Sequence, residues 1–250
     1  MTFTGGRTIM IAIAAFLAGA AGTALATGAV SPSPQVSAGE RAKIEAVVRD
    51  YILANPEIIP EAIERLQNRE VSKSIDANRK ALETPYASAW AGNPNGDATL
   101  VVFYDYACGF CRRSLPDIER LLKEDKNLKV VFRELPILSD DSTKASRAAL
   151  AAAEQGKFKA FHDALYETGR PNAANVERVQ KQLGIDPAKS AAAIASPAVQ
   201  KEIDANLEIA RALRFTGTPS WVVGDQVLNG AIGYEALKAA IAKARTRAGG

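Results

Sequence analysis

The amino-acid sequence predicts an α/β fold with an inserted helical domain, preceded by a separate N-terminal helical segment. Three observations support this prediction. A strand of the buried type at 99–104 is followed by a helical pattern and by a second such strand at 128–133. A long stretch at about 140–214 is helical throughout and shows no strand pattern. A hairpin pattern at 220–228 and a closing helix follow, so the sheet is assembled from two separated halves.

The first 26 residues have the features of an export signal. Arg7 precedes a run of apolar or small residues from 9 to 25, and Ala24-Leu25-Ala26 fits the small-residue cleavage pattern. The alternative is an uncleaved membrane anchor, for which the Ala- and Gly-rich run is marginal in length. We therefore predict a signal peptide at 1–26 and a Ser/Pro-rich linker at 27–37. The predicted location is the periplasm, a compartment in which disulfides form.

Composition and charge narrow the class of protein. The chain has 250 residues, of which 47% are hydrophobic and 24% charged, which suits one good core and is atypical of a disordered or multi-pass membrane protein. The net charge is +3 and there is no long Lys/Arg run. We therefore predict no nucleic-acid partner.

Residues 38–84 are predicted to form two amphipathic helices. An apolar face recurs with helical spacing and then continues beyond the break at Asn55-Pro56, where Asn55 is expected to cap the second helix. The residues on this stripe are Ile44, Val47, Val48, Tyr51, Ile52, Ile59, Ile63 and Leu66. An apolar helix face of this kind is normally buried against another protein surface. The two alternatives are packing on the same chain and formation of a homo-oligomer through 38–84.

The main domain is predicted to span 85–250. The strand at 99–104 is continuous, β-branched and aromatic, which is typical of a strand buried on both faces. The helix at 112–125 connects it to the strand at 128–133, so the two strands are expected to be parallel. Gly224-Asp225 suits the two-residue turn of a hairpin, and Asp186-Pro187 and Ser196-Pro197 each suit a helix start.

The two cysteines, Cys108 and Cys111, lie three residues apart at the start of a helix. Unpaired N–H groups of the first helical turn favour a thiolate at Cys108, and Cys111 lies one turn along within bonding reach. Gly109 and Phe110 form the loop between them. The pattern predicts a redox pair in which Cys108 attacks and Cys111 resolves. Arg112 and Arg113 either add positive potential or are ordinary solvated residues.

Other uses of this cysteine pair fit less well. Structural zinc needs four Cys or His ligands, and His162 is the one other candidate, so a zinc site would have to be shared between two subunits. A structural disulfide in so short a loop gains little entropy. We interpret His162 as a packed helix residue, because thiol exchange needs no histidine base. The prediction is therefore no metal, and no cofactor beyond the Cys108–Cys111 disulfide.

The main domain resembles the DsbA-like branch of the thioredoxin superfamily. The segments that carry the resemblance are VVFYDYACGFC, VVFRELPIL, ASRAALAAAEQGKFKAFHDALY and GTPSWVVG. The resemblance implies a thioredoxin fold with a helical domain inserted at about 140–214. It also implies that Thr218-Pro219 is cis, lies beside the cysteine pair and binds an extended substrate peptide.

The match also has departures. DsbA-type oxidases carry Cys-Pro-His-Cys, whereas the middle pair here is Gly109-Phe110, so a milder thiolate is expected. The Gly-aromatic pair and the Thr before the proline look more like disulfide isomerases such as DsbC. The segment 38–84 is similar to the oligomerising stalk of ScsC-type proteins. The usual buried acid of the first strand is replaced by Val102, and Asp105 and Glu134 are candidate proton-relay substitutes, each of which has a purely structural alternative.

These features lead to a functional prediction. We expect an exported thiol–disulfide oxidoreductase that acts on unfolded or misfolded exported proteins, as a disulfide isomerase or reductase. The alternatives are a DsbA-like dithiol oxidase and, less favoured, a copper-binding or chaperone module, because two close thiols can hold Cu(I). A membrane reductase or oxidase is the expected redox partner.

Overall fold

The computed structural model describes residues 37–248. The chain divides into two compact units, with the boundary between Ile59 and Pro60. The predicted signal peptide at 1–26 and nearly all of the predicted linker at 27–37 lie outside the described residues. Between residues 37 and 248, no helix combines the length and the apolar character needed to cross a membrane.

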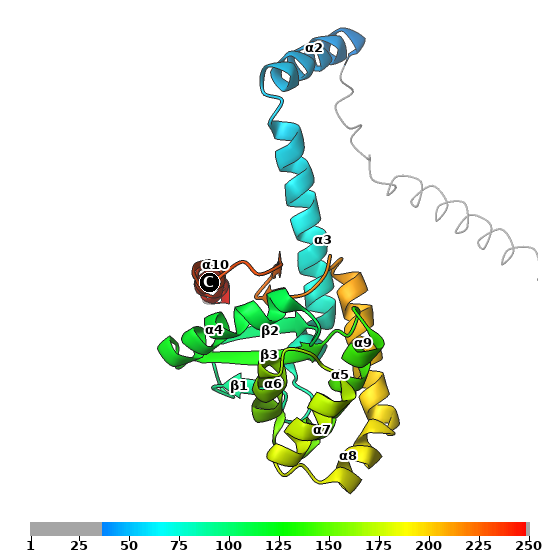
Figure 1. Ribbon diagram of the computed structural model, residues 1–250. Coiled ribbons are helices and arrows are strands. Elements are labelled where there is room, and N and C mark those ends of the chain that lie inside the picture. Colours follow the sequence, from blue (N-terminus) through cyan, green and yellow to red (C-terminus); the bar gives the residue numbers. More distant parts are fainter. Residues whose placement is uncertain (1–36, 249–250) are drawn as a thin grey trace, which may run out of the picture. The chain divides into compact units, whose positions relative to one another are not determined.

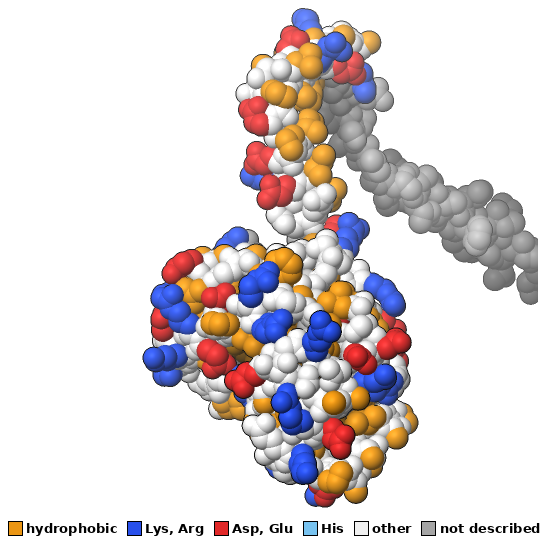
Figure 2. All heavy atoms as spheres, viewed as in Figure 1, with side chains coloured by type: hydrophobic (Ala, Val, Ile, Leu, Met, Phe, Trp, Pro, Cys, Tyr) orange, Lys and Arg blue, Asp and Glu red, His pale blue; other side chains and the backbone are white. Residues whose placement is uncertain are grey.

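The first unit contains helix α2 (Ala38–Ala54), which starts at a capping box formed by Ser37 and Glu40. None of its residues is buried, and five of its large apolar side chains are 49–68% exposed. Hydrophobic atoms lie at the surface of this helix in Figure 2. The side chain of Asn55 bonds back to the carbonyl of Tyr51 and so caps the end of α2. Our expectation that Asn55 caps the next helix is therefore wrong, because that helix begins only at Ile58.

The second unit is built on a five-stranded mixed sheet (Figure 1). Strand β2 pairs in parallel with β3, and the other neighbours are antiparallel, in the spatial order β1-β3-β2-β4-β5. The strands are β1 (Trp90–Gly92), β2 (Ala98–Tyr104), β3 (Leu128–Glu134), β4 (Ser220–Val223) and β5 (Gln226–Asn229). The parallel pair and the hairpin were predicted from the sequence. Strand β1 was not predicted, because three residues carry too little periodicity.

Alternate residues of the central strands enter two different cores. Leu100, Val102 and Tyr104 of β2 pack on one face against helices α4 (Gly109–Glu124) and α10 (Tyr234–Ala248) and against the helical insertion. Val101 and Phe103 pack on the other face. The continuous apolar run of β2 thus results from a strand that is covered on both sides, as predicted.

The helical insertion contains five helices, α5 to α9. Asp186 and Ser196 cap α8 and α9 through their side chains, and a proline follows each of them, as the sequence predicts. The bounds are α5 (Asp140–Glu154), α6 (Phe158–Glu167), α7 (Ala173–Gln182), α8 (Pro187–Ile194) and α9 (Pro197–Ala212). The last helix also covers the second face of the sheet through Ile209.

Helix α3 (Ile58–Glu83) contributes to the same second face. Ile75 and Leu82 are buried in that core, and Pro60 onward belongs to the same compact unit as the sheet. We expected 38–84 to lie outside a main domain that starts at 85, so the structure places part of α3 differently. The reason is the buried Arg133 of β3, whose guanidinium donates to the carbonyls of Leu82 and Thr84 and pairs with Glu202 at 2.6 Å.

Candidate active site

Cys108 is the N-cap residue of helix α4. Strand β2 ends at Tyr104, and the chain turns through a short loop in which the Cys108 N–H donates to the Asp105 carbonyl at 3.0 Å. The backbone N–H of Cys111 then donates to the Cys108 sulfur at 3.3 Å. The sulfur therefore occupies the position in which a cap side chain satisfies a free N–H of the first turn. This is the local geometry that the sequence predicts for the attacking thiol.

The two thiols differ strongly in acidity. The thiol of Cys111, together with Thr218 and the N–H groups of Cys111 and Phe110, forms hydrogen bonds that lower the pKa of Cys108 to about 5, although burial opposes this shift. Burial, and secondarily the hydrogen bond to Cys108, raises the pKa of Cys111 well above that of an ordinary thiol. Cys108 is thus the thiolate at neutral pH.

Exposure does not distinguish the two cysteines. Both are free thiols, and Cys108 is 6% exposed against 4% for Cys111. The cover over Cys108 includes Thr218, whose carbonyl oxygen lies 3.2 Å from the Cys108 sulfur. Phe110, between the cysteines, is 58% exposed. The asymmetry of the pair therefore lies in hydrogen bonding and acidity.

The Thr218–Pro219 peptide bond is cis, as the resemblance implies. Pro219 directly precedes β4. Because β4 pairs with β2, Pro219 lies at the end of the sheet where the cysteine loop follows β2. Thr218 and the cysteine pair, 110 residues apart in sequence, are therefore neighbours in space.

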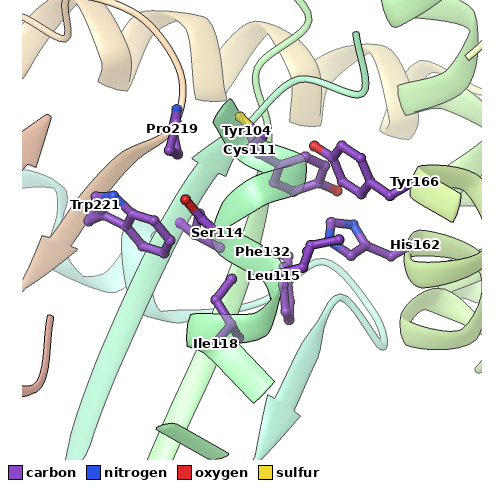
Figure 3. Close-up of a pocket in the computed structure, with 11 residues that line it drawn as sticks. Tyr104, Cys111, Ser114, Leu115, Ile118, Phe132, His162, Tyr166, Pro219 and Trp221 are labelled. Atoms are coloured by element: carbon purple, nitrogen blue, oxygen red, sulfur yellow. The ribbon is translucent and has the colours of Figure 1, made fainter. Parts of the chain in front are cut away.

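A small cavity of about 10 Å³ lies behind Cys111 (Figure 3). Its wall is formed by α4, the central strands and helix α6. The lining residues include Val102, Tyr104, Cys111, Ser114, His162, Tyr166 and Pro219. This volume is near the minimum that holds one water molecule, and the wall offers several polar atoms.

Glu134 lies next to this wall and is fully buried. Of the described carboxyl groups beside the wall, it is the one whose pKa is raised. The parallel register sets it beside Tyr104, whose hydroxyl donates to one carboxyl oxygen, while Ser146 donates to the other at 2.6 Å. Burial raises the pKa of Glu134 to about 8, despite the opposing effect of these two hydrogen bonds. The carboxyl group can therefore gain or lose a proton near neutral pH.

Asp105, the other candidate for proton transfer, has a different environment. Its carboxylate accepts from the backbone N–H groups of Ala107, Ile137 and Leu138 at 2.7–2.9 Å and from the Ser142 hydroxyl at 2.6 Å. These four hydrogen bonds tie the end of β2 to the loop after β3 and to α5. Its environment favours the structural alternative.

His162 and the two arginines lie close to the pair without bonding to it. His162 is buried among aromatic rings, its Nδ1 lies 3.2 Å from the Tyr106 hydroxyl, and burial lowers its pKa well below the usual range. Arg113 stacks over the Phe110 ring at 4.2 Å. The lowered pKa of Cys108 arises mainly from hydrogen bonds.

Sequence reasoning missed the tyrosines that surround the cavity. Tyr104 was read as part of a buried strand, and Tyr106 and Tyr166 were not singled out. Tyr166 donates to the Asp105 carbonyl at 2.9 Å, and the Tyr104 and Tyr106 hydroxyls lie 3.5 Å apart. The available signal was a tyrosine directly before and after Asp105 at the end of a buried strand, where each hydroxyl needs a partner.

Comparison with known proteins identifies the domain. The family model of the DSBA-like thioredoxin domain matches residues 99–242, and that of the N-terminal domain of copper resistance protein ScsC matches residues 40–71. These matches confirm the thioredoxin fold that the sequence analysis expected.

Proteins that are similar to the chain include two solved structures and one curated relative. A thioredoxin-like oxidoreductase from Silicibacter pomeroyi is 40% identical, with a TM-score of 0.65 over 68% of this chain and 98% of that one. A linker-deletion mutant of ScsC from Proteus mirabilis is 28% identical, with a TM-score of 0.67 over 87% of this chain and all (100%) of that one. The Na⁺/H⁺ antiporter NhaA 3 of Salinispora tropica is 30% identical over 61% of this chain, which spans only 24% of that relative's length.

Proposed function

The chain belongs to the DSBA-like thioredoxin domain family, and on this premise we propose that it is a thiol–disulfide oxidoreductase that reduces or rearranges the disulfides of exported proteins. The observation that carries the proposal is the acidity difference between the two thiols at the start of α4. With a pKa of about 5, Cys108 is about 99% thiolate at pH 7. The thiolate is the form that attacks a disulfide.

The proposed cycle starts from the reduced pair. The Cys108 thiolate attacks one sulfur of a substrate disulfide, a mixed disulfide forms, and the other substrate sulfur leaves as a thiolate. Cys111 then loses its proton and attacks the Cys108 sulfur, which releases the second substrate sulfur. The substrate has gained two electrons, and the enzyme holds the Cys108–Cys111 disulfide. In isomerisation, the released substrate thiolate attacks another substrate disulfide. The thiolate freed there then attacks the substrate sulfur of the mixed disulfide, which forms a new substrate disulfide and releases Cys108 as a thiolate.

Substrate binding is assigned to the loop that carries Thr218 and Pro219. Its nearness to the Cys108 sulfur, with the Thr218 carbonyl at 3.2 Å, supports this assignment. An extended substrate backbone at this loop would present its own sulfur to Cys108.

Proton transfer from Cys111 is the step that needs a further group, because burial keeps this thiol protonated. We assign the acceptor role to Glu134, which is reached through the Tyr104 hydroxyl and one water molecule in the cavity that Cys111 and Tyr104 both line. With a pKa of about 8, Glu134 is mostly protonated at pH 7, so it accepts the proton in its ionised fraction, which grows as the pH rises towards 8, and returns it later. Asp105 is not assigned this role.

The direction of electron flow is proposed to favour isomerisation or reduction. The loop pair Gly109-Phe110 lacks the histidine typical of strong oxidants, and Cys108 reaches a pKa of about 5 rather than the lower value of such oxidants, about 3.5. A membrane reductase is the proposed partner that keeps the pair reduced, and the export pattern at 1–26 supports a periplasmic location.

The N-terminal helix is proposed to associate with further copies of the chain. Helix α2 exposes five large apolar side chains to solvent. An apolar surface of this kind is unfavourable in water. These residues are Ile44, Val47, Val48, Tyr51 and Leu53. Light scattering on residues 27–250 should give a multiple of the monomer mass, and a monomer mass would contradict this part of the proposal.

The experiment that tests the function is the reactivation of a scrambled protein with several disulfides by residues 27–250. Strong reactivation that is lost in Cys108→Ala is the expected result. Rapid oxidation of a reduced substrate by the disulfide form, without reactivation, would instead indicate an oxidase. Absence of both activities would refute the assignment.

A further inference from the structure

His162 is the single histidine of the chain and is only 1% exposed. Five aromatic rings surround it, with centroid distances of 4.6–5.5 Å. An apolar ring would fill such a site without the cost of burying two ring nitrogens. Nδ1 lies 3.2 Å from the Tyr106 hydroxyl, whereas Nε2 has no hydrogen-bond partner within the part of the chain that the structure describes. His162 and Cys111 line the same cavity (Figure 3), so both border the space for one water molecule.

A chain of hydrogen bonds runs from His162 to Glu134. Nδ1 bonds to the Tyr106 hydroxyl, which lies 3.5 Å from the Tyr104 hydroxyl. Tyr104 in turn donates to the carboxyl group of Glu134. The link between the two tyrosines is the longest of the three and therefore the weakest. The nearby hydroxyl of Tyr166 takes no part, because it donates to a backbone carbonyl at 2.9 Å.

The direction of this chain depends on the protonation of Glu134, because each hydroxyl has one proton to donate. When Glu134 is a carboxylate, Tyr104 donates to it and Tyr106 donates to Tyr104. Tyr106 then needs a donor, which is the Nδ1–H group of His162. When Glu134 is protonated and donates to Tyr104, both hydroxyls turn the other way and Nδ1 becomes the acceptor. Burial lowers the pKa of His162 well below its usual range, so the ring stays neutral and its one proton then lies on Nε2.

We propose that His162 is a second entry point for the proton that Cys111 releases, and that the position of its own ring proton follows the protonation of Glu134. One proton passes from the Cys111 thiol through the cavity water to Nε2. The ring gives its Nδ1 proton to Tyr106, Tyr106 gives one to Tyr104, and Tyr104 gives one to Glu134. Each group between the two ends gains one proton and loses one, so the negative charge moves from Glu134 to the Cys111 sulfur. The inference rests on the proposed function, whose proton-transfer step it extends.

Several charged side chains act on the chain without belonging to it. These are Asp105 and Glu202 near Glu134, Asp163 near Tyr106, and Lys159 near His162. All four have hydrogen bonds to groups outside the chain. They therefore shift the pH at which the chain reverses, and they do not carry its protons.

The test is nitrogen NMR of residues 27–250, made without a histidine tag and with ¹⁵N in the histidine ring. The disulfide form is used, so that the cysteines do not titrate. A single histidine gives one pair of ring signals, and their positions identify the nitrogen that carries the proton. We expect the proton on Nε2 at about pH 6 and on Nδ1 at about pH 9.5, with a midpoint near the pKa of Glu134, about 8. A proton that stays on one nitrogen over this range would overturn the inference, and so would a doubly protonated ring at about pH 7.

Three variants make the test specific. Glu134→Gln has no proton to exchange, so its histidine should keep one tautomer at every pH. Tyr106→Phe breaks the chain next to the ring and should also fix the tautomer, although Glu134 still titrates. Asp163→Asn removes a charge beside His162 and leaves the chain intact, so it should keep the pH-dependent change of the wild type.

A change of tautomer that survives in Glu134→Gln or in Tyr106→Phe, or that is lost in Asp163→Asn, would overturn the inference. Reactivation of the scrambled substrate by the same protein tests the proposed function separately. A fixed tautomer together with full reactivation would therefore overturn the inference alone, whereas absence of reactivation would refute the proposed function whatever the tautomer does.

Discussion

Replacement of Glu134 by glutamine should change the way in which stability depends on pH. Burial raises the pKa of Glu134 from the reference value of 4.5 to about 8 in the folded protein. Between these two values the folded state holds a proton that the unfolded state has released. The contribution of Glu134 to stability is therefore complete below pH 4.5 and is lost as the pH rises through 8.

The size of the effect follows from the two pKa values. Each pH unit in this window costs about 1.4 kcal/mol, so the unfolding free energy should fall by roughly 3 kcal/mol between pH 5 and pH 8 on account of Glu134 alone. Glutamine has no proton to lose, and it preserves an oxygen for the Tyr104 hydroxyl. Glu134→Gln should therefore lack this fall and gain stability relative to the wild type as the pH rises.

The assay is guanidinium denaturation of both proteins at pH 5 and pH 8. The oxidised form is used, so that Cys108 and Cys111 do not titrate. Glu154→Gln is the matched control, since Glu154 also accepts from a tyrosine hydroxyl but is exposed to solvent. The same pH dependence in the wild type and in Glu134→Gln would refute both the burial argument and the proton-transfer role.

Three further predictions concern other parts of the second unit. Thiolate absorbance near 240 nm should titrate with a midpoint near pH 5 and vanish in Cys108→Ala, whereas a midpoint above pH 8 would contradict the hydrogen-bond account. Arg133→Met should cost about 3–5 kcal/mol in denaturant unfolding because Glu202 keeps a charge without its partner, and the double variant with Glu202→Leu should recover most of this loss. Gly92→Ala should cost at least about 1 kcal/mol more than Gly156→Ala: both have positive φ, but a Cβ at 92 meets a backbone carbonyl and one at 156 meets open space.

Much of the fold could be predicted because its central strands are covered on both faces. The run at 99–104 has no charged or amide residue, which predicts a buried strand. The hairpin is predicted by Gly224-Asp225 between two apolar runs. Cys108 and Cys111 could be placed at a helix start because they lie between the strand pattern at 99–104 and the helical pattern at 112–125.

The contribution of α3 could not be predicted in the same way. Its buried positions, Ile75 and Leu82, are seven residues apart in an otherwise polar stretch, and a stripe that narrow gives a weak pattern. Much of its attachment is polar: Arg79 pairs with Asp225 at 2.5 Å, and Arg133 reaches it from the sheet. Partners so far apart in sequence leave no local signal.

The site proposed for proton transfer could be predicted only in part, for a related reason. Glu134 could be named as a charged residue at the end of a buried strand, but its pairing with Tyr104 depends on the parallel register, and Ser146 comes from a helix of the insertion. A single sequence gives neither the register nor the helix position.

The consecutive residues Arg133 and Glu134 give strand β3 a role beyond packing. Because successive side chains of a strand point to opposite faces, Arg133 holds the end of α3 on one side of the sheet while Glu134 meets Tyr104 on the other. Two consecutive residues of β3 thus contact the end of α3 on one face and Tyr104, beside the cavity behind Cys111, on the other. A substitution at Arg133 or Glu134 therefore changes a strand that carries a second contact on its opposite face.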